Sequence, residues 1–488
     1  MYGITMAPDF DRAGLQWFNV ANPLMLTDLR GRMVILDFFT SCCINCMHAL
    51  PVLRRVEERF DRQVAVIGVH SPKFPAERRD DAIARAIARY GIRHPVIHDP
   101  HMLLWDEYRI RAWPTLVFIS PDGHIVGRLA GEPHPDMLPE GIGRMLREFW
   151  RRGEIQPGGL PLAIAPPPAG RLLFPGKIKR VPDIHGSALW AVADAGHHQI
   201  ALFDDGGRET ARFGRGVAGF DDGAADAACF NGPQGLIADA EAIFVADTGN
   251  HAIRRIDRLT GAVTTLAGTG VRGLALTRPT PASTTALASP WDLELVGGRL
   301  YFANAGSHQI GCLELAGAMV WPAAGSGDEG IVDGAAARAE LAQPSGLAAS
   351  ADGRSLYFAD SEVSAVRILG LDGAARVTTL VGAGLFEWGH VNGGLAEARL
   401  QHPLGLAVLG DRVVVADSYN DALRVVDPQA RQVTDLHGMT CEDARCLPFS
   451  EPAGIAADGP NRLLLADTNN HRIVEFRLDE GRYRTWSA

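Results

Sequence analysis

Hydrophobic and polar positions follow a pattern of strands and helices over residues 33–151. Continuous apolar runs, MVILDFF at 33–39 and QVAVIGVH at 63–70, alternate with stretches whose apolar residues recur every three or four positions. Continuous apolar runs are typical of strands buried on both faces, and the three-to-four spacing is typical of amphipathic helices. A PDG turn between two further apolar runs predicts a hairpin. Together these elements predict an α/β unit, a mixed sheet with helices on both faces.

Short strand-like runs repeat along the chain beyond residue 170. In six related stretches, such as IFVADTGNHAIRRID and LLLADTNNHRIVEFR, an apolar run ends on an acid or amide, which is Asp194, Asp247, Asn304, Asp360, Asp417 or Asp467. The steps of 53, 57, 56, 57 and 50 residues, with several short strands in each, are typical of propeller blades. The pattern therefore predicts an all-β segment that forms a six-bladed propeller, with RYRTWSA in its last blade.

A stretch rich in Pro and Gly separates the two patterns. Residues 152–170, RGEIQPGGLPLAIAPPPAG, show no periodicity and predict a linker between domains at 1–151 and 171–488. The middle of this linker is apolar, unlike a solvated flexible tether. We therefore expect it to pack down and to hold the two domains together, with the cysteines near the interdomain cleft.

Composition narrows the function classes. The 488 residues hold 47 Lys and Arg against 57 Asp and Glu, and the net charge of −10 argues against nucleic acid as the main partner. No stretch approaches 18 uninterrupted apolar residues, so we expect no membrane span. The first twenty residues lack the basic and apolar regions of a secretory signal, which predicts a cytoplasmic protein. Seven cysteines in a chain of this length are no disulfide framework.

Three of the seven cysteines, Cys42, Cys43 and Cys46, stand between a predicted buried strand and a predicted helix. A Cys-x-x-Cys pair in such a setting is a candidate redox pair. Cys43 and Cys46 lie at i and i+3 on one helical face, where Cα atoms about 5–5.5 Å apart allow a disulfide. A bridge from Cys42 would close a strained vicinal ring or approach the ~7 Å limit.

Within this pair, Cys43 is nearer the helix N-terminus, where unpaired N–H groups and the dipole favour the thiolate. We therefore expect Cys43 to attack and Cys46 to resolve the mixed disulfide, with Cys42 as a bystander. Two other interpretations stay open. The domain is a non-catalytic scaffold, or Cys42, Cys43, Cys46 and His48 bind Zn²⁺ or Cu⁺, although no second pair of ligands is obvious.

Other candidate features lie among the repeats. The repeated acids are expected to accept backbone hydrogen bonds at turns rather than to bind metal. The acidic loops GFDDGAADAACF and GDEGIVDGAAAR lack the spacing of an EF-hand, which leaves Ca²⁺ binding open. Cys441 and Cys446 are five apart in a loop, which leaves a disulfide between them open, but unpaired surface thiols are the expectation in a reducing cytosol.

The segment VILDFFTSCCINCMHALP resembles the active-site segment of thioredoxins and their TlpA-like and peroxiredoxin-like relatives. In this resemblance Cys43 and Cys46 match the redox motif and Asp37 matches the buried acid. Pro114 in AWPTLVFI matches the cis-proline. The resemblance implies that Asp37 accepts the proton of Cys46 and that Pro114 presents backbone to an extended substrate. Trp113, directly before that proline, would narrow the peptide groove.

The repeats resemble NHL repeats, with Pro-x-Gly-Ile/Leu starts in PQGL, PSGL, PLGL and PAGI. The combination resembles the family of NHL repeat-containing protein two across nearly the whole chain. It implies a thioredoxin-like domain of the TlpA-like and peroxiredoxin-like branch, followed by a six-bladed NHL propeller. The implied activity is that of a thiol–disulfide oxidoreductase without cofactor or resident metal, regenerated by an external dithiol. Its partners would be proteins that bind the propeller face and the interdomain cleft.

Overall fold

The computed structural model describes residues 5–183, 188–373 and 375–487. The chain divides into two units, Met1–Pro168 and Ala169–Ala488, and this boundary falls inside the segment predicted to be a linker. No helix among the described residues is both long and apolar enough to cross a membrane.

The first unit is built on one mixed sheet of seven strands. In sheet order they are β1 (Thr5–Met6), β7 (His124–Ala130), β6 (Thr115–Ile119), β3 (Met33–Phe39), β4 (Val64–His70), β5 (Val96–His98) and β2 (Gln16–Phe18). β3 runs parallel to β4 and antiparallel to β6. Every residue of β3 and β4 is buried, which explains why both strands are nearly continuous apolar runs.

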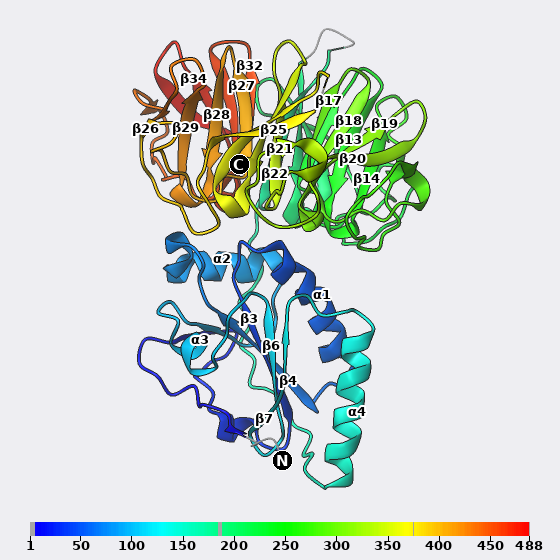
Figure 1. Cartoon of the computed structure of the whole chain (residues 1–488), viewed down its shortest axis with the longest axis vertical. Helices are drawn as coiled ribbons and strands as arrows, with labels where there is room; N and C mark the ends of the chain where they lie inside the picture. Colours follow the sequence, from blue (N-terminus) through cyan, green and yellow to red (C-terminus); the bar gives the residue numbers. More distant parts are fainter. Residues whose placement is uncertain (1–4, 184–187, 374, 488) are drawn as a thin grey trace. The chain divides into compact units, whose positions relative to one another are not determined.

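Helices cover both faces of this sheet (Figure 1). They are α1 (Ile44–Arg59), α2 (Asp80–Tyr90), α3 (Leu103–Glu107) and α4 (Met137–Arg151). α1 and α4 share one face, where Val56 and Ile142 belong to the same buried cluster as Ile35 of β3. α2 packs at the end of β3 on that face, whereas α3 contributes Leu104 to the core on the opposite face. The predicted α/β unit with helices on both faces is confirmed.

Part of the predicted linker lies along the first unit. The N–H of Gln156 donates to the carbonyl of Gly31 at 2.7 Å, and the N–H of Ala163 donates to the carbonyl of Asn19 at 2.8 Å. These bonds attach residues 156–163 to the unit that precedes them, as expected for a segment that is not a solvated tether.

The second unit is a propeller of six sheets, formed by the described residues of 169–488. Blade one contains β8 (Pro175–Val181), β9 (Leu189–Asp194), β10 (Gln199–Asp204) and β11 (Glu209–Phe213). Blade two contains β12 (Gly235–Ala238), β13 (Ala242–Asp247), β14 (Ala252–Asp257) and β15 (Val263–Ala267). Blade three contains β17 (Pro290–Val296), β18 (Arg299–Asn304), β19 (Gln309–Glu314), β20 (Met319–Ala324) and the outer β16 (Thr280–Pro281).

The remaining three blades also carry a short fifth strand. Blade four contains β22 (Pro344–Ala349), β23 (Ser355–Asp360), β24 (Ala365–Gly370), β25 (Arg376–Val381) and the outer β21 (Gly334–Ala335). Blade five contains β27 (Gly405–Leu409), β28 (Arg412–Asp417), β29 (Ala422–Asp427), β30 (Gln432–Asp435) and β26 (Gly393–Gly394). Blade six contains β32 (Pro452–Asp458), β33 (Arg462–Asp467), β34 (Arg472–Arg477), β35 (Arg482–Ser487) and β31 (Thr440–Cys441).

The ring closes between the first and the last blade, since β8 contacts both β12 and β32. Across this closure the hydroxyl of Thr468 donates to the carbonyl of Pro175 at 2.8 Å. The same kind of bond joins neighbouring blades elsewhere, for example from Ser418 to the carbonyl of Pro452 at 2.6 Å. The predicted six-bladed propeller is therefore confirmed, and β35 places the RYRTWS part of the C-terminal stretch in the last blade.

Candidate active site

Cys43 and Cys46 lie at the first turn of α1, just after the end of β3. Cys43 is the N-cap residue, with extended backbone at φ −81° and ψ 120°, and its carbonyl accepts the N–H groups of Cys46 and Met47, both at 3.1 Å. Cys43 is half-buried, whereas Cys46 is only 2% exposed. The structure thus places the more accessible sulfur at the positive end of the helix dipole and the other one turn further in.

The buried thiol of Cys46 holds its proton tightly. Burial raises the pKa of Cys46 well above its usual value, and its hydrogen bond to Cys43 and the charge of Asp37 raise that pKa further. A thiol in these surroundings becomes a nucleophile only after a base has taken its proton.

Asp37 is the candidate for the base that takes the proton of Cys46. It lies on β3, is fully buried, and neither of its carboxylate oxygens has a hydrogen-bond partner among the described residues. Burial raises the pKa of Asp37 to about 7, although the charge of His94 acts in the opposite direction. A carboxyl group with this pKa can both accept and return a proton near neutral pH.

Glu77 is a buried acid that the sequence analysis does not identify. It lies in the short 3-10 helix Pro75–Arg78, and its Oε1 accepts the hydroxyl of Thr40 at 2.6 Å and the N–H of Ser41 at 2.8 Å. The same oxygen accepts the Ser41 hydroxyl at 2.7 Å and the N–H of Cys42 at 3.2 Å. One carboxylate oxygen therefore holds the whole loop between β3 and the Cys-x-x-Cys pair.

The second oxygen of Glu77 accepts the N–H groups of Lys73 and Phe74, both at 2.9 Å. Burial opposes its ionisation, but the hydrogen bond and the charge of His70, followed by the bonds from Phe74 and Thr40, lower the pKa of Glu77 to about 2. The side chain thus stays charged at any working pH. In the sequence, the only sign of this role is that Glu77 stands three residues after Phe74, the residue before the 3-10 helix. The capping-box pattern that would predict such a role needs Ser or Thr at the position of Phe74.

Two further buried histidines continue from Glu77. His70 Nε2 lies 3.7 Å from Glu77 Oε1, and His70 Nδ1 lies 3.0 Å from Nδ1 of His98. His98 Nε2 is 3.1 Å from the carbonyl of Arg78. Burial, together with the charge of His70, lowers the pKa of His98, while the Arg78 carbonyl raises it. The contacts with His98 hold the His70 ring beside the Glu77 carboxylate.

Cys42 and His48 do not join the redox pair in one metal site. The Cys42 sulfur is buried, 3.5 Å from the hydroxyl oxygen of Thr40, and His48 Nδ1 lies 2.7 Å from Glu132 Oε1. Within the described chain, no three ligand atoms from Cys42, Cys43, Cys46 and His48 lie within 4.8 Å of one another. The arrangement does not bring together the donors that a tetrahedral Zn²⁺ site needs.

The peptide bond between Trp113 and Pro114 is cis, as the resemblance implies. The Trp113 indole N–H donates to the carbonyl of Ser71 at 2.8 Å, and its ring lies 4.4 Å from that of Trp105. Trp113 and Cys43 both pack against the buried cluster that contains Cys46. The structure therefore brings the proline segment and the cysteine pair to the same end of the sheet.

Comparisons with known proteins agree with this architecture. A thioredoxin-like family model matches residues 31–125, and an NHL repeat model matches residues 449–476. NHL repeat-containing protein 2 of Gallus gallus is 38% identical over 515 residues, which cover 97% of this chain and 70% of that protein. The chain belongs to the NHL repeat-containing protein 2 family.

Two other relatives extend the range of the comparison. The Arabidopsis thaliana protein SUPPRESSOR OF QUENCHING 1, chloroplastic, is 37% identical over 98% of this chain and 47% of its own length. The thiol-disulfide oxidoreductase ResA of Bacillus anthracis is 26% identical over 27% of this chain and 72% of its own length. The thioredoxin-like domain of this family member thus has oxidoreductase relatives.

The acids repeated along the propeller of this family member are structural. In blade four Asp360 accepts the N–H of Ala342 at 2.7 Å and the guanidinium of Arg367 at 2.8 Å, and Arg367 also reaches Asp333 at 3.0 Å. Asp360 and Arg367 are fully buried, and burial raises the pKa of Asp360 against the charge of Arg367. The same buried pair recurs as Asp247–Arg254, Asp417–Arg424 and Asp467–Arg472. As predicted, these acids accept backbone N–H groups, but the N–H groups belong to the preceding segment rather than to the following turn.

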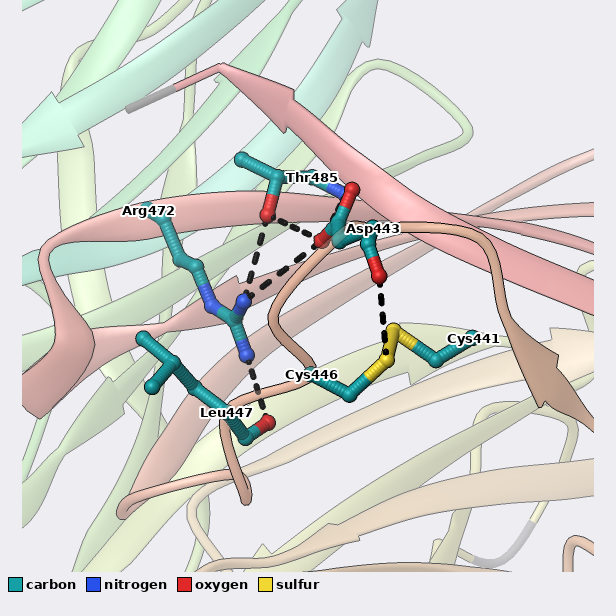
Figure 2. Close-up of a disulfide and its surroundings, with 6 residues drawn as sticks. All are labelled: Cys441, Asp443, Cys446, Leu447, Arg472 and Thr485. Atoms are coloured by element: carbon teal, nitrogen blue, oxygen red, sulfur yellow. Dashed lines mark hydrogen bonds and ion pairs between the residues drawn. A yellow bond between two sulfur atoms is a disulfide. The ribbon is translucent and has the colours of Figure 1, made fainter.

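A disulfide joins Cys441 to Cys446 in blade six, where the sequence analysis expects two unpaired thiols (Figure 2). That expectation is wrong because the loop between them is tightly folded and brings the Cα atoms to 6.1 Å, within bridging range. Asp443 in this loop accepts the N–H of Thr485 at 3.0 Å and its hydroxyl at 2.7 Å, and lies 3.8 Å from Arg472. The disulfide thus closes a loop that is already anchored to β34 and β35.

Proposed function

We propose that this protein is a thiol–disulfide oxidoreductase in which Cys43 attacks and Cys46 resolves. The observation that carries the proposal is the N-cap position of the half-buried Cys43, with the buried Cys46 one turn further along α1. The helix dipole favours a thiolate at the first position, and burial keeps the second thiol protonated until it is needed. The oxidoreductase relatives of the domain support the same reaction class.

The reaction in the reducing direction has two steps. The Cys43 thiolate attacks one sulfur of a substrate disulfide, so that a Cys43–substrate bond forms and the other substrate sulfur leaves as a thiolate. Cys46 then gives its proton to Asp37 and attacks the Cys43 sulfur, which releases the second substrate thiolate. The Cys43–Cys46 disulfide that remains is reduced by an external dithiol, and the reverse sequence oxidises a substrate dithiol.

Three other residues support the pair in this proposal. Glu77 holds the loop that leads into Cys43 through four hydrogen bonds, and two more attach the same carboxylate to its own segment. Pro114 and Trp113 form one wall of the site, and the extended substrate pairs with backbone next to the proline. Cys42 takes no part in the exchange.

The propeller acts as a platform that recruits protein substrates or partners. Propeller loops expose large apolar side chains, among them Val271 at 65%, Leu274 at 84% and Phe386 at 69% exposure. Val271 and Leu274 lie three residues apart in one loop, which supports a contact surface for a protein rather than for a nucleic acid. The net charge of −10 points the same way.

A cytoplasmic location stays part of the proposal. It rests on the small number of cysteines and on the use of a Cys-x-x-Cys pair as a redox site. The Cys441–Cys446 disulfide is more typical of an oxidising compartment, and one relative is named as chloroplastic, so the location is tested directly. Fractionation of cells that express the tagged full chain, with compartment markers, gives a direct answer.

The experiment that tests the assignment is alkylation of the full chain against pH. Fast alkylation that persists at low pH should disappear in Cys43→Ser and remain in Cys46→Ser and Cys42→Ser. Loss of the fast phase in Cys42→Ser but not in Cys43→Ser would show that the assignment is wrong. Absence of a fast phase in the unsubstituted protein would favour the non-catalytic scaffold.

A further inference from the structure

Asp37 lies beside a glycine, Gly68, in the neighbouring strand. Asp37 and Gly68 are register partners in the parallel pair β3–β4, so both point to the same face of the sheet. A Cβ atom on Gly68 would lie 2.9 Å from the ring of Phe39 and 3.5 Å from Nε2 of His94. The missing side chain therefore leaves room for the His94 imidazole on the face to which Asp37 points.

His94 connects this face with the protein surface. Its carbonyl accepts the side-chain amide of Asn19 at 2.9 Å, which holds the segment before β5, and its own side chain is 4% exposed. Its Nδ1 lies 3.4 Å from Oε2 of Glu57 on α1, whose side chain is 32% exposed. One imidazole thus has one nitrogen toward the interior and the other beside a carboxylate that water reaches.

The interior side of this arrangement holds polar atoms that lack partners. The two carboxylate oxygens of Asp37 have no hydrogen bond to any described residue, and neither does Nε2 of His94. Buried polar atoms without partners are rare in folded proteins, and a catalytic or redox role is one of the reasons for them. Of the titratable groups around Asp37, α1 contributes Cys46 and the segment before β5 contributes His94, whose charge lowers the pKa of Asp37.

We propose that His94 is a positioning residue that carries the proton between Asp37 and the surface at Glu57, and so sets the pH at which Cys46 can resolve the mixed disulfide. The inference rests on the proposed thiol–disulfide exchange and names its proton route. Asp37 takes the proton of the Cys46 thiol. The imidazole, in its neutral form, then takes that proton at Nε2 through a bridging water, because no direct hydrogen bond joins the two groups. Nδ1 releases a proton to Glu57 or to water. No electron moves in these steps, and the reverse order returns the proton when the disulfide is reduced.

The test follows the two thiolates that a symmetric nitrobenzoate disulfide releases. The first coloured thiolate leaves when Cys43 attacks, and the second leaves when Cys46 attacks the mixed disulfide, so one assay separates the two steps. In a Cys42→Ser background, we compare His94→Gln with the unsubstituted His94 and with His124→Gln, a partly exposed histidine on β7 paired with Asp122. The second release is recorded against pH.

His94→Gln removes the group that takes the proton from Asp37 and, with it, the imidazolium charge that favours ionised Asp37 while that proton is on His94. The midpoint of the second release should therefore move up by roughly one pH unit. The first release and the His124→Gln profile should stay unchanged. In an Asp37→Asn background the His94→Gln substitution should have no further effect, which a merely structural role of His94 would not produce. Glu57→Gln should move the midpoint in the same direction by a smaller amount.

Two failures are distinguishable. An unchanged midpoint in both His94→Gln and Glu57→Gln, with two clear releases, would overturn the route through His94 and leave the exchange reaction intact. A missing second release in the unsubstituted chain would overturn the exchange reaction itself. If His94→Gln does not fold, Glu57→Gln provides the test. A raised midpoint that disappears in the Asp37→Asn background would support the route, and an unchanged midpoint would overturn it.

Discussion

Oε1 of Glu77 accepts the backbone N–H of Ser41 at 2.8 Å, although 36 residues separate the two in the sequence. The bond ties the loop before Cys43 to a carboxylate that lies in a different element, the short 3-10 helix after β4. The geometry of the cysteine pair therefore depends on a charge that the Cys-x-x-Cys motif itself does not contain.

Glu77→Gln should destabilise the first unit and disorder the loop at residues 40–42. Glu77 has a pKa of about 2 against an ordinary value of 4.5, so its charge contributes on the order of 3 kcal/mol to the free energy of unfolding. That contribution is complete above pH 4.5 and is lost as pH falls toward 2. Urea unfolding of the full chain between these pH values measures it.

The matched control is Glu107→Gln, which removes a half-exposed ion pair with Arg12 at 2.7 Å. Exposed pairs contribute roughly 0–1 kcal/mol, so this variant should unfold almost like the unsubstituted chain. Equal stability of the two variants would show that Glu77 does not hold the loop.

Asp37→Asn should make the first unit more stable at neutral pH and slower in its reaction. The pKa of Asp37 is raised from 3.8 to about 7, so the charged form opposes folding, and stability falls as pH rises from 3.8 through 7. Removal of the charge should recover up to about 4 kcal/mol above pH 7 and abolish this pH dependence. Denaturant titrations at several pH values provide the measurement, and a stability that falls equally in both proteins would contradict it.

The buried pair in blade four should be strongly coupled. Arg367→Gln leaves Asp360 charged and without its guanidinium, which should cost about 3–5 kcal/mol in the free energy of unfolding of the propeller. Asp360→Asn together with Arg367→Gln removes both charges, as in blade three, where the uncharged Asn304 and Gly311 stand at the corresponding positions. The double variant should therefore be more stable than Arg367→Gln alone. Additive losses in calorimetry would argue against a coupled pair.

The Cys441–Cys446 disulfide should stabilise blade six by about 2 kcal/mol, the value that chain entropy gives for so short a loop. Cys441→Ser with Cys446→Ser should lower the free energy of unfolding by that amount and leave the reactivity of Cys43 unchanged. Mass spectrometry of protein that is alkylated while denatured and unreduced checks the bond. Two alkyl groups on these cysteines would show that the loop is open.

The sequence predicts those features of the fold and of the site that depend on residues close together in the chain. The spacing of Cys43 and Cys46 after a buried strand, and the period of the repeated acids, follow from strand burial and blade length. Glu77 and His94 carry no such signal. Each is buried only because tertiary packing brings its segment against β3 or α1, and burial is what changes the chemistry of these side chains.

The disulfide in blade six shows a different limit. The expectation of unpaired thiols follows from the assumed compartment, whereas the pairing follows from how Asp443 and Thr485 fold the loop. A compartment rule cannot predict a distance between two Cα atoms.

In the proposed reaction Cys43 attacks the substrate disulfide and Cys46 resolves the mixed disulfide. The most direct measurement is mass-spectrometric mapping of the mixed disulfide that Cys46→Ser forms with the symmetric nitrobenzoate disulfide, with Cys43→Ser/Cys46→Ser as the matched control. We predict one adduct, on Cys43, that persists in Cys46→Ser, is absent from the control, and is released by Cys46 in the unsubstituted chain. An adduct on Cys42, or an adduct on Cys43 that the unsubstituted chain does not resolve, would contradict the account.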